Sequence, residues 1–211
     1  MAGADGAAAE AAGIRHLRIL ADAAATAEAA PDVDGVLAAV GGALWDLGLN
    51  GHLALLEPGG SALVIRSVVL DSAGLAQVER VLGRAMADAR IDLDVPTPYQ
   101  QVVRTGRALR VDAPLWWARL FAPPLGLPEA TAVADLIRLG EVALVPIVAG
   151  VSVLGVLTTW AWRLSDGDVA AAELLGQTAG AVLRRRHGSA AGGARPPGLP
   201  SATPLAGAVP A

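Results

Sequence analysis

The sequence predicts an α+β domain: a central antiparallel sheet of about six strands, flanked by helices, with a long helix near each end of the chain. Three observations lead to this prediction. Apolar, β-branched segments occur in adjacent pairs around Gly-containing turns, as in β-hairpins. Segments with the helical spacing of apolar residues lie between and outside these pairs. The 211 residues are enough to bury a core.

Two helices are expected before the first strand. In the first of them, apolar residues recur at spacings of three, four and three, which is typical of one helical face: Ile14, Leu17, Ala21 and Ala24. Pro31, Asp32 and Asp34 mark the start of the second helix, because proline and acidic residues favour a first turn. Residues 1–12 lack the positively charged start of a secretory signal peptide, so we expect a cytoplasmic protein. We also expect the N-terminus to be flexible over residues 1–13.

The first pair of strands is expected over residues 52–56 and 63–70. Glu57–Ser61 joins them and has the composition of a tight turn. A helix is expected over about 73–89, followed by a short strand at 91–94 in which apolar and acidic residues alternate.

The next segment is expected to be short helices and loops around a short strand. Thr97 and Gln100 have the spacing of a capping box, which predicts a helix that ends near residue 106. A strand is expected over 108–111, a loop with Pro and Trp over 112–128, and a short helix over 129–139.

A long apolar segment, Val142–Trp162, allows two interpretations. It has 21 residues without a charge, which is the length of a transmembrane helix. Pro146 and Gly150 interrupt it, however, and its many Val and Thr residues favour strands. We therefore expect two strands joined at Gly150. A protein anchored in a membrane through residues 142–162 is the minor alternative.

The chain is expected to finish with a long helix and a tail. Ser165 and Asp168 form a second capping-box pattern, which predicts a helix over about 167–186. Residues 188–211 are rich in Gly, Pro and Ala and bury too little to fold, so we expect them to be disordered. The predicted folded domain is residues 14–187.

Three segments in order along the chain resemble a known family. Residues 102–112 are similar to its pattern of helix, Thr-Gly-Arg, short strand and Asp. Residues 145–157 are similar to its Val-Pro-Leu … Gly-Val-Leu hairpin, and residues 164–183 to its closing helix. The family is that of GAF domains, sensory modules of signalling proteins that are related in shape to PAS domains. The resemblance covers about residues 14–186 and implies a stand-alone GAF/PAS-like sensory domain.

Composition excludes several classes of chemistry. The chain has no Cys, and all 16 basic residues are Arg, so disulfides, thiol nucleophiles, a P-loop Lys and Schiff-base chemistry are ruled out. A net charge of −4 and a pI near 5.3 argue against a nucleic-acid surface. No metal motif or catalytic constellation is present, so we expect that the protein is not an enzyme and has no evident cofactor.

Within the family, several known ligand chemistries do not fit these residues. The bilin-attaching and methionine sulfoxide reductase branches use Cys, and the cyclic-nucleotide signature needs an Asn-Lys pair, whereas Asn50 is the single Asn here. Haem-binding members use a His ligand. We interpret His16 and His187 as solvated. His52 begins the first strand and is interpreted as an ordinary residue at a strand edge, with a haem ligand as the minor alternative.

The resemblance implies a ligand between one face of the sheet and the segment that crosses it, about 95–140. Tyr and Trp suit a pocket wall because they combine an apolar body with a polar tip. The side chains expected to line the site are Tyr99, Arg110, Trp116, Trp117 and Phe121, with Trp160 as its floor. The alternative is that these large side chains only fill the core.

The two terminal helices suggest a dimer seam. The second stripe has the same spacing as the first and consists of Ala172, Leu175, Ala179 and Val182. Small residues at such positions let helices approach closely. We therefore expect a homodimer, with both stripes packing on the chain's own sheet as the alternative.

Two functional hypotheses follow. The first is a sensor that binds an unknown small molecule and acts in trans on a signalling partner, such as a histidine kinase or transcriptional regulator; the chain could equally be a fragment of a larger protein. The second is a ligand-free interaction or dimerisation module. We expect neither nucleic acid nor a membrane as a partner.

Overall fold

One antiparallel sheet organises the molecule. The computed structural model describes residues 2–112 and 126–192. Its six strands are arranged in the order β3-β2-β1-β6-β5-β4, which confirms the predicted α+β class. The strands are β1 (Asn50–Leu56), β2 (Ala62–Val69), β3 (Arg90–Asp92), β4 (Leu109–Val111), β5 (Glu141–Ala149) and β6 (Ser152–Ala161).

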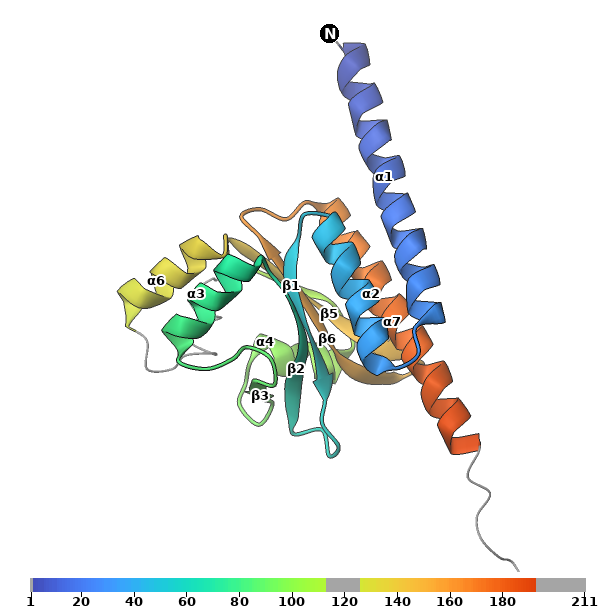
Figure 1. The fold of residues 1–211 in the computed structure, drawn as a ribbon, viewed down its shortest axis with the longest axis vertical. Helices are drawn as coiled ribbons and strands as arrows, with labels where there is room; N and C mark the ends of the chain where they lie inside the picture. Colours follow the sequence, from blue (N-terminus) through green and yellow to red (C-terminus); the bar gives the residue numbers. More distant parts are fainter. Residues whose placement is uncertain (1, 113–125, 193–211) are drawn as a thin grey trace, which may run out of the picture.

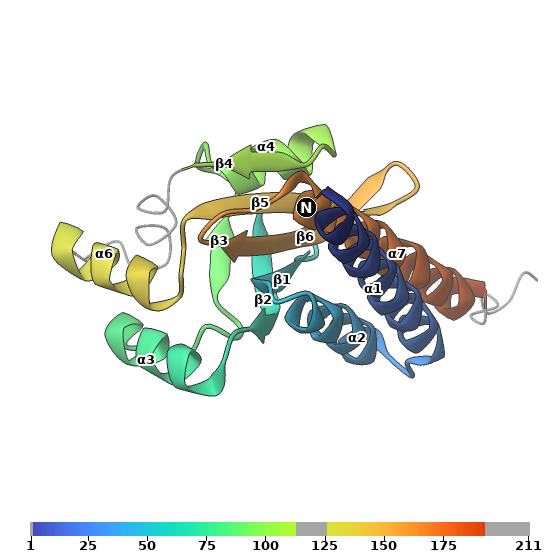
Figure 2. The same ribbon diagram turned by 90° about the horizontal axis from the view of Figure 1, so that it is seen from above.

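The helices divide between the two faces of the sheet. Figures 1 and 2 show α1, α2 and α7 on one face and α3, α4 and α6 on the other. Their bounds are α1 (Ala2–Ala29), α2 (Val33–Asp46), α3 (Ser72–Leu82), α4 (Pro98–Thr105), α6 (Leu127–Leu136) and α7 (Asp166–Gly192). Each face has its own apolar cluster, so the sheet lies between two cores.

Capping side chains start several helices where the sequence predicted. The side chains of Asp32, Asp71 and Thr97 each accept a hydrogen bond from the backbone N–H three residues later. Ser165 and Asp168 form the reciprocal capping box at the start of α7, since each side chain accepts from the other's backbone N–H.

The apolar segment 142–162 forms the central hairpin of the sheet. β5 and β6 pair antiparallel along their length and meet in a turn at Gly150, whose φ of 69° is in the left-handed region that favours glycine. The predicted hairpin is therefore confirmed. Within residues 2–112 and 126–192, no helix has the length and apolar character needed to cross a membrane.

Some boundaries differ from the expectation. α1 already begins at Ala2, because its Ala-rich start has a high helix propensity, whereas residues 1–13 were expected to be flexible. α3 stops at Leu82 because Gly83 adopts a left-handed φ of 66°. α7 continues to Gly192, and the rest of the expected tail lies outside the described residues. The domain limits of 14 and 187 stay a prediction.

α7 packs unusually close to β5 because two glycines face the strand. A Cβ on Gly176 would lie 2.9 Å from Val145 Cγ1, and a Cβ on Gly180 would overlap the backbone of Val148. The close approach lets α7 cover the middle of the sheet without a gap, and its buried stripe joins the α1/α2 core.

We expect Gly180→Ala to destabilise the fold by about 1–3 kcal/mol, because the added methyl group must displace α7 from the backbone of β5. Gly42→Ala is the matched control: Gly42 also lies within a helix, but a Cβ there meets nothing within 4 Å. The control should gain about 0.5–1 kcal/mol from helix propensity alone. Urea unfolding of both variants checks this, and a stabilised Gly180→Ala would contradict the packing.

Candidate functional site

A small polar cluster lies in the apolar core between the sheet and the helices α3, α4 and α6. Its members are His52 on β1, Tyr99 on α4 and Thr158 on β6, all fully buried. His52 and Thr158 are direct partners across the β1–β6 ladder and point to the same face. Tyr99 joins them because the Thr97 cap and Pro98 place it in the first turn of α4.

The three side chains form one chain of hydrogen bonds. The Thr158 hydroxyl donates to the Tyr99 hydroxyl over 3.1 Å, and the Tyr99 oxygen lies 3.0 Å from His52 Nε2. Tyr99 then donates its own proton to Nε2, which requires a neutral imidazole with its proton on Nδ1. Burial agrees with this assignment, because desolvation lowers the pKa of His52 to about 3.

Trp160 lies beside this cluster and anchors α6. Its ring centroid is 6.0 Å from that of His52, and its indole N–H donates to the Ile137 carbonyl over 3.0 Å. The Asn50 side chain donates to the same carbonyl. The last turn of α6 is thereby held against the ends of β1 and β6.

The structure brings only part of the expected ligand site together. Tyr99 and Trp160 lie on the same sheet face, as expected, and both are fully buried. Neither of them lines any of five cavities that described residues outline. Trp116, Trp117 and Phe121 lie outside the described residues. Contact between these residues and a ligand stays a prediction.

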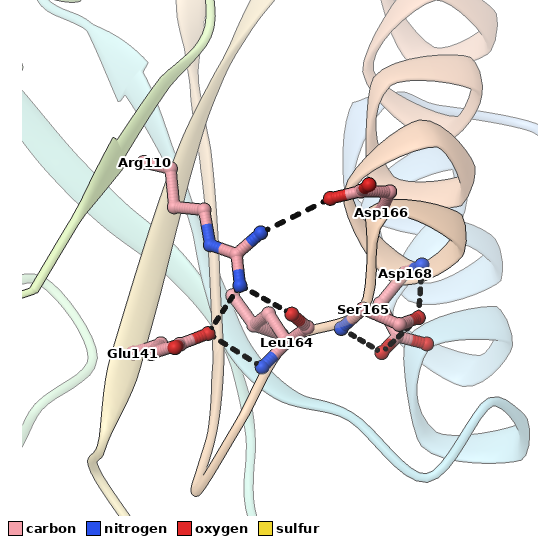
Figure 3. A network of polar contacts seen from close by, with 6 residues as sticks. All are labelled: Arg110, Glu141, Leu164, Ser165, Asp166 and Asp168. Atoms are coloured by element: carbon pink, nitrogen blue, oxygen red, sulfur yellow. Dashed lines mark hydrogen bonds and ion pairs between the residues drawn. The ribbon is translucent and has the colours of Figure 1, made fainter.

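Arg110 makes its polar contacts away from the cluster of His52, Tyr99 and Thr158. Figure 3 shows it at the start of α7, where its guanidinium binds Glu141 Oε2 at 2.5 Å, Asp166 Oδ1 at 3.2 Å and the Leu164 carbonyl. The hydrogen bond with Glu141 is the main reason why the pKa of Arg110 is raised. Arg110 therefore ties β4 and β5 to α7, and its contact with a ligand stays a prediction.

Glu141 is the acidic centre of this network. Its Oε2 accepts from the Leu164 backbone N–H over 2.8 Å as well as from Arg110. These two contacts, the backbone one first, lower the pKa of Glu141. The sequence pattern placed Glu141 only at the edge of an apolar segment, because its partners are distant in the chain.

The two stripes expected to form a dimer seam have different surroundings. Ala172, Leu175, Ala179 and Val182 are buried in the core beneath α7, so that half of the expected seam packs on its own sheet. On α1, Ile14 is 63% exposed and Leu17 is 67% exposed. Ala21 is also exposed and Ala24 is half-buried, because α1 packs through a different face that includes Ala23 and Ala27.

The fold is that of GAF domains. The GAF domain of a phosphoenolpyruvate-protein phosphotransferase from Coxiella burnetii matches with a TM-score of 0.61 and 15% identity, over 84% of this chain and 98% of that one. A methyl-accepting chemotaxis protein, residues 122 to 287, matches with a TM-score of 0.56 and 19% identity, over 77% and 95%. Neither a family model nor a curated protein matches the sequence.

A third neighbour corrects one expectation. The reduced form of fRMsr from Staphylococcus aureus matches with a TM-score of 0.53 and 17% identity, over 80% of this chain and 94% of that one. Because this fold supports an enzyme there, the prediction that the present chain is not an enzyme is contradicted.

Acid should destabilise the folded chain through His52. The unfolded chain takes up a proton at this residue below about pH 6.5, whereas the folded chain keeps it neutral down to about pH 3. Stability therefore falls as pH falls through this window, by about 1.5 kcal/mol between pH 6.5 and pH 5 for a single such group. The lowered pKa of Glu141 acts only below its ordinary value of 4.5.

His52→Gln should remove this loss, because the amide can accept from Tyr99 without titrating. Urea unfolding of the wild type and of His52→Gln at the two pH values measures it. An unchanged pH dependence in His52→Gln would show that His52 is not the group responsible.

Proposed function

We propose that the chain is a regulatory module of signal transduction that senses a small molecule and acts in trans on a partner. The observation that carries the proposal is the polar chain of Thr158, Tyr99 and His52 within an apolar core. Binding sites are typically apolar with a few placed polar groups, and groups with strongly shifted pKa values gather at them. The cluster lies on the sheet face where the GAF resemblance implies a ligand.

The partner is proposed from the kind of protein in which this fold occurs. One neighbour of the same fold is part of a methyl-accepting chemotaxis protein. A histidine kinase or a transcriptional regulator is the partner we favour, in the cytoplasm. A ligand would regulate it only by binding one state of the module more tightly than the other.

We further propose that two copies associate through α1. The N-terminal part of this helix projects beyond the body of the domain (Figure 1) and carries the exposed Ile14 and Leu17 on one side. A projecting helix gains most of its stability from packing of an apolar face. A second α1 offers an identical face with small residues at Ala21 and Ala24, which suits close helix pairing.

A ligand-free interaction module is the second candidate. It is favoured by one specific observation: His52, Tyr99 and Trp160 are all fully buried, so these side chains themselves fill the space between them. In that case the α1 surface would be the functional one.

The dimer is tested by charge on α1. We expect the double variant Ile14→Glu/Leu17→Glu to be monomeric, because both carboxylates would be desolvated at the seam. Val81→Glu, an exposed apolar residue of α3 on the other side of the sheet, is the control and should leave the mass unchanged. Light scattering after size exclusion measures it; a dimer that survives the double variant would rule out this seam.

The sensor is tested by native mass spectrometry of the full chain against a denatured control. We expect a non-covalent adduct that is lost on denaturation and depleted in Thr158→Val. Thr159→Val is the matched control, because Thr159 is an equally buried hydroxyl on the same strand that donates instead to the Asn50 carbonyl. Equal adduct levels in both variants would show that the polar cluster is not part of the ligand site. An unliganded mass in every sample would favour the ligand-free module.

A further inference from the structure

An open cavity of about 620 Å³ lies at one end of the sheet, and none of His52, Tyr99 and Thr158 lines it. The ends of α2, β1, α6 and β6 surround it. Its size is within the range of small-molecule sites, about 300–1,000 Å³. Five of its lining side chains carry the argument: Trp45, Leu136, Arg138, Trp162 and Arg163.

The walls of this cavity present large apolar side chains to solvent. Trp45 is 53% exposed, Trp162 is 65% exposed and Leu136 is 44% exposed. Single exposed apolar residues are ordinary, but three that line one cavity offer apolar contact area to a bound molecule. Indole faces favour contact with another flat ring.

The same cavity is positively charged. Arg138 and Arg163 line it, and in the part of the chain that the structure describes neither guanidinium makes a hydrogen bond or an ion pair. Arg163 is still near enough to Glu141 to help lower its pKa. The acidic residue of the lining, Asp71, already accepts from the Gly74 N–H at the start of α3. The guanidinium groups of both arginines are therefore available to bind an anion, with little competition from carboxylates of the protein.

The backbone at Arg138 has a conformation that is unfavourable for an arginine. Its φ is 54°, a left-handed conformation that costs a non-glycine residue on the order of 1 kcal/mol. The turn is enforced on both sides, because the Ile137 carbonyl accepts from Asn50 and Trp160 and the Arg138 carbonyl accepts from Gly140. Glycine would suit the turn better, so an arginine at this position lowers the stability of the fold.

We propose that this cavity binds a small planar organic anion. Its ring lies against Trp45 and Trp162, and its carboxylate or phosphate is bound by Arg138 and Arg163, whose planar guanidinium groups match either anion. The site is distinct from the polar cluster around His52 and does not depend on the function proposed for that cluster.

Calorimetric titration of the full chain tests the proposal with three probes of one shape: 2-naphthoate, 2-naphthyl phosphate and the neutral 2-naphthamide. We expect at least one anion to bind with a Kd of about 1 mM or below, as a ligand of this size can. The amide should bind at least about tenfold more weakly, because it lacks the charge-assisted hydrogen bonds. The two anions distinguish a carboxylate site from a phosphate site.

Two variants separate binding from folding. Arg138→Gly should lower the affinity for the more tightly bound anion by about tenfold or more. It should also raise the melting temperature, because glycine relieves the strain of the left-handed backbone conformation. Trp162→Ala should lower the affinity for both the anion and the amide, because both probes would lose the same ring contact. Arg104→Gln, an exposed arginine of α4, is the control and should bind as the wild type does.

Three results would overturn the proposal. They are equal affinity for the anions and the amide, wild-type affinity in Arg138→Gly, or no binding of any probe. A change of oligomeric state in Trp162→Ala without a change in probe binding would instead assign the surface to contact with another protein.

Discussion

The close approach of α7 to β5 is the contact on which the rest of the structure depends. Gly176 and Gly180 let the helix axis come so near the strand that a methyl group would meet the backbone. The sheet is thereby covered by one helix across its middle, α2 completes that layer, and α1 packs on α2 and α7. Arg110 and Glu141 then hold the start of α7 to β4 and β5. A shift of α7 would therefore move the C-terminal helix itself and the N-terminal helix α1 that packs on it.

The opposite layer has a different character. There the apolar core encloses the side chains of Thr158, Tyr99 and His52. They form one chain of hydrogen bonds, in which Thr158 donates to Tyr99 and Tyr99 donates to His52. A neutral histidine is required for this chain, so burial and hydrogen bonding depend on each other. Trp160 and Asn50 extend the polar contacts to the end of α6, where the arginine-lined cavity begins. The two candidate binding regions thus share a wall without sharing residues that would touch a ligand.

The sites were harder to predict than the elements. Tyr99 and Trp160 could be placed on one sheet face from the sequence, because large amphipathic side chains stand out among few aromatics. His52 could not be recognised as the centre of that face, since its partners are 47 and 106 residues away along the chain. The partners of Arg110 could not be predicted for the same reason, because Glu141 and Asp166 are brought near only by the sheet and by α7.

Local chemistry is what the sequence alone determined. Capping residues, turn glycines and β-branched runs act over a few residues, and they were sufficient for the starts of α2, α4 and α7 and for the β5–β6 hairpin. Strand order, the burial of the α7 stripe and the exposure of the α1 stripe were decided by the tertiary structure. Identical spacings on those two helices have opposite environments, because periodicity shows only that a helix has an apolar face, and packing alone selects what covers it.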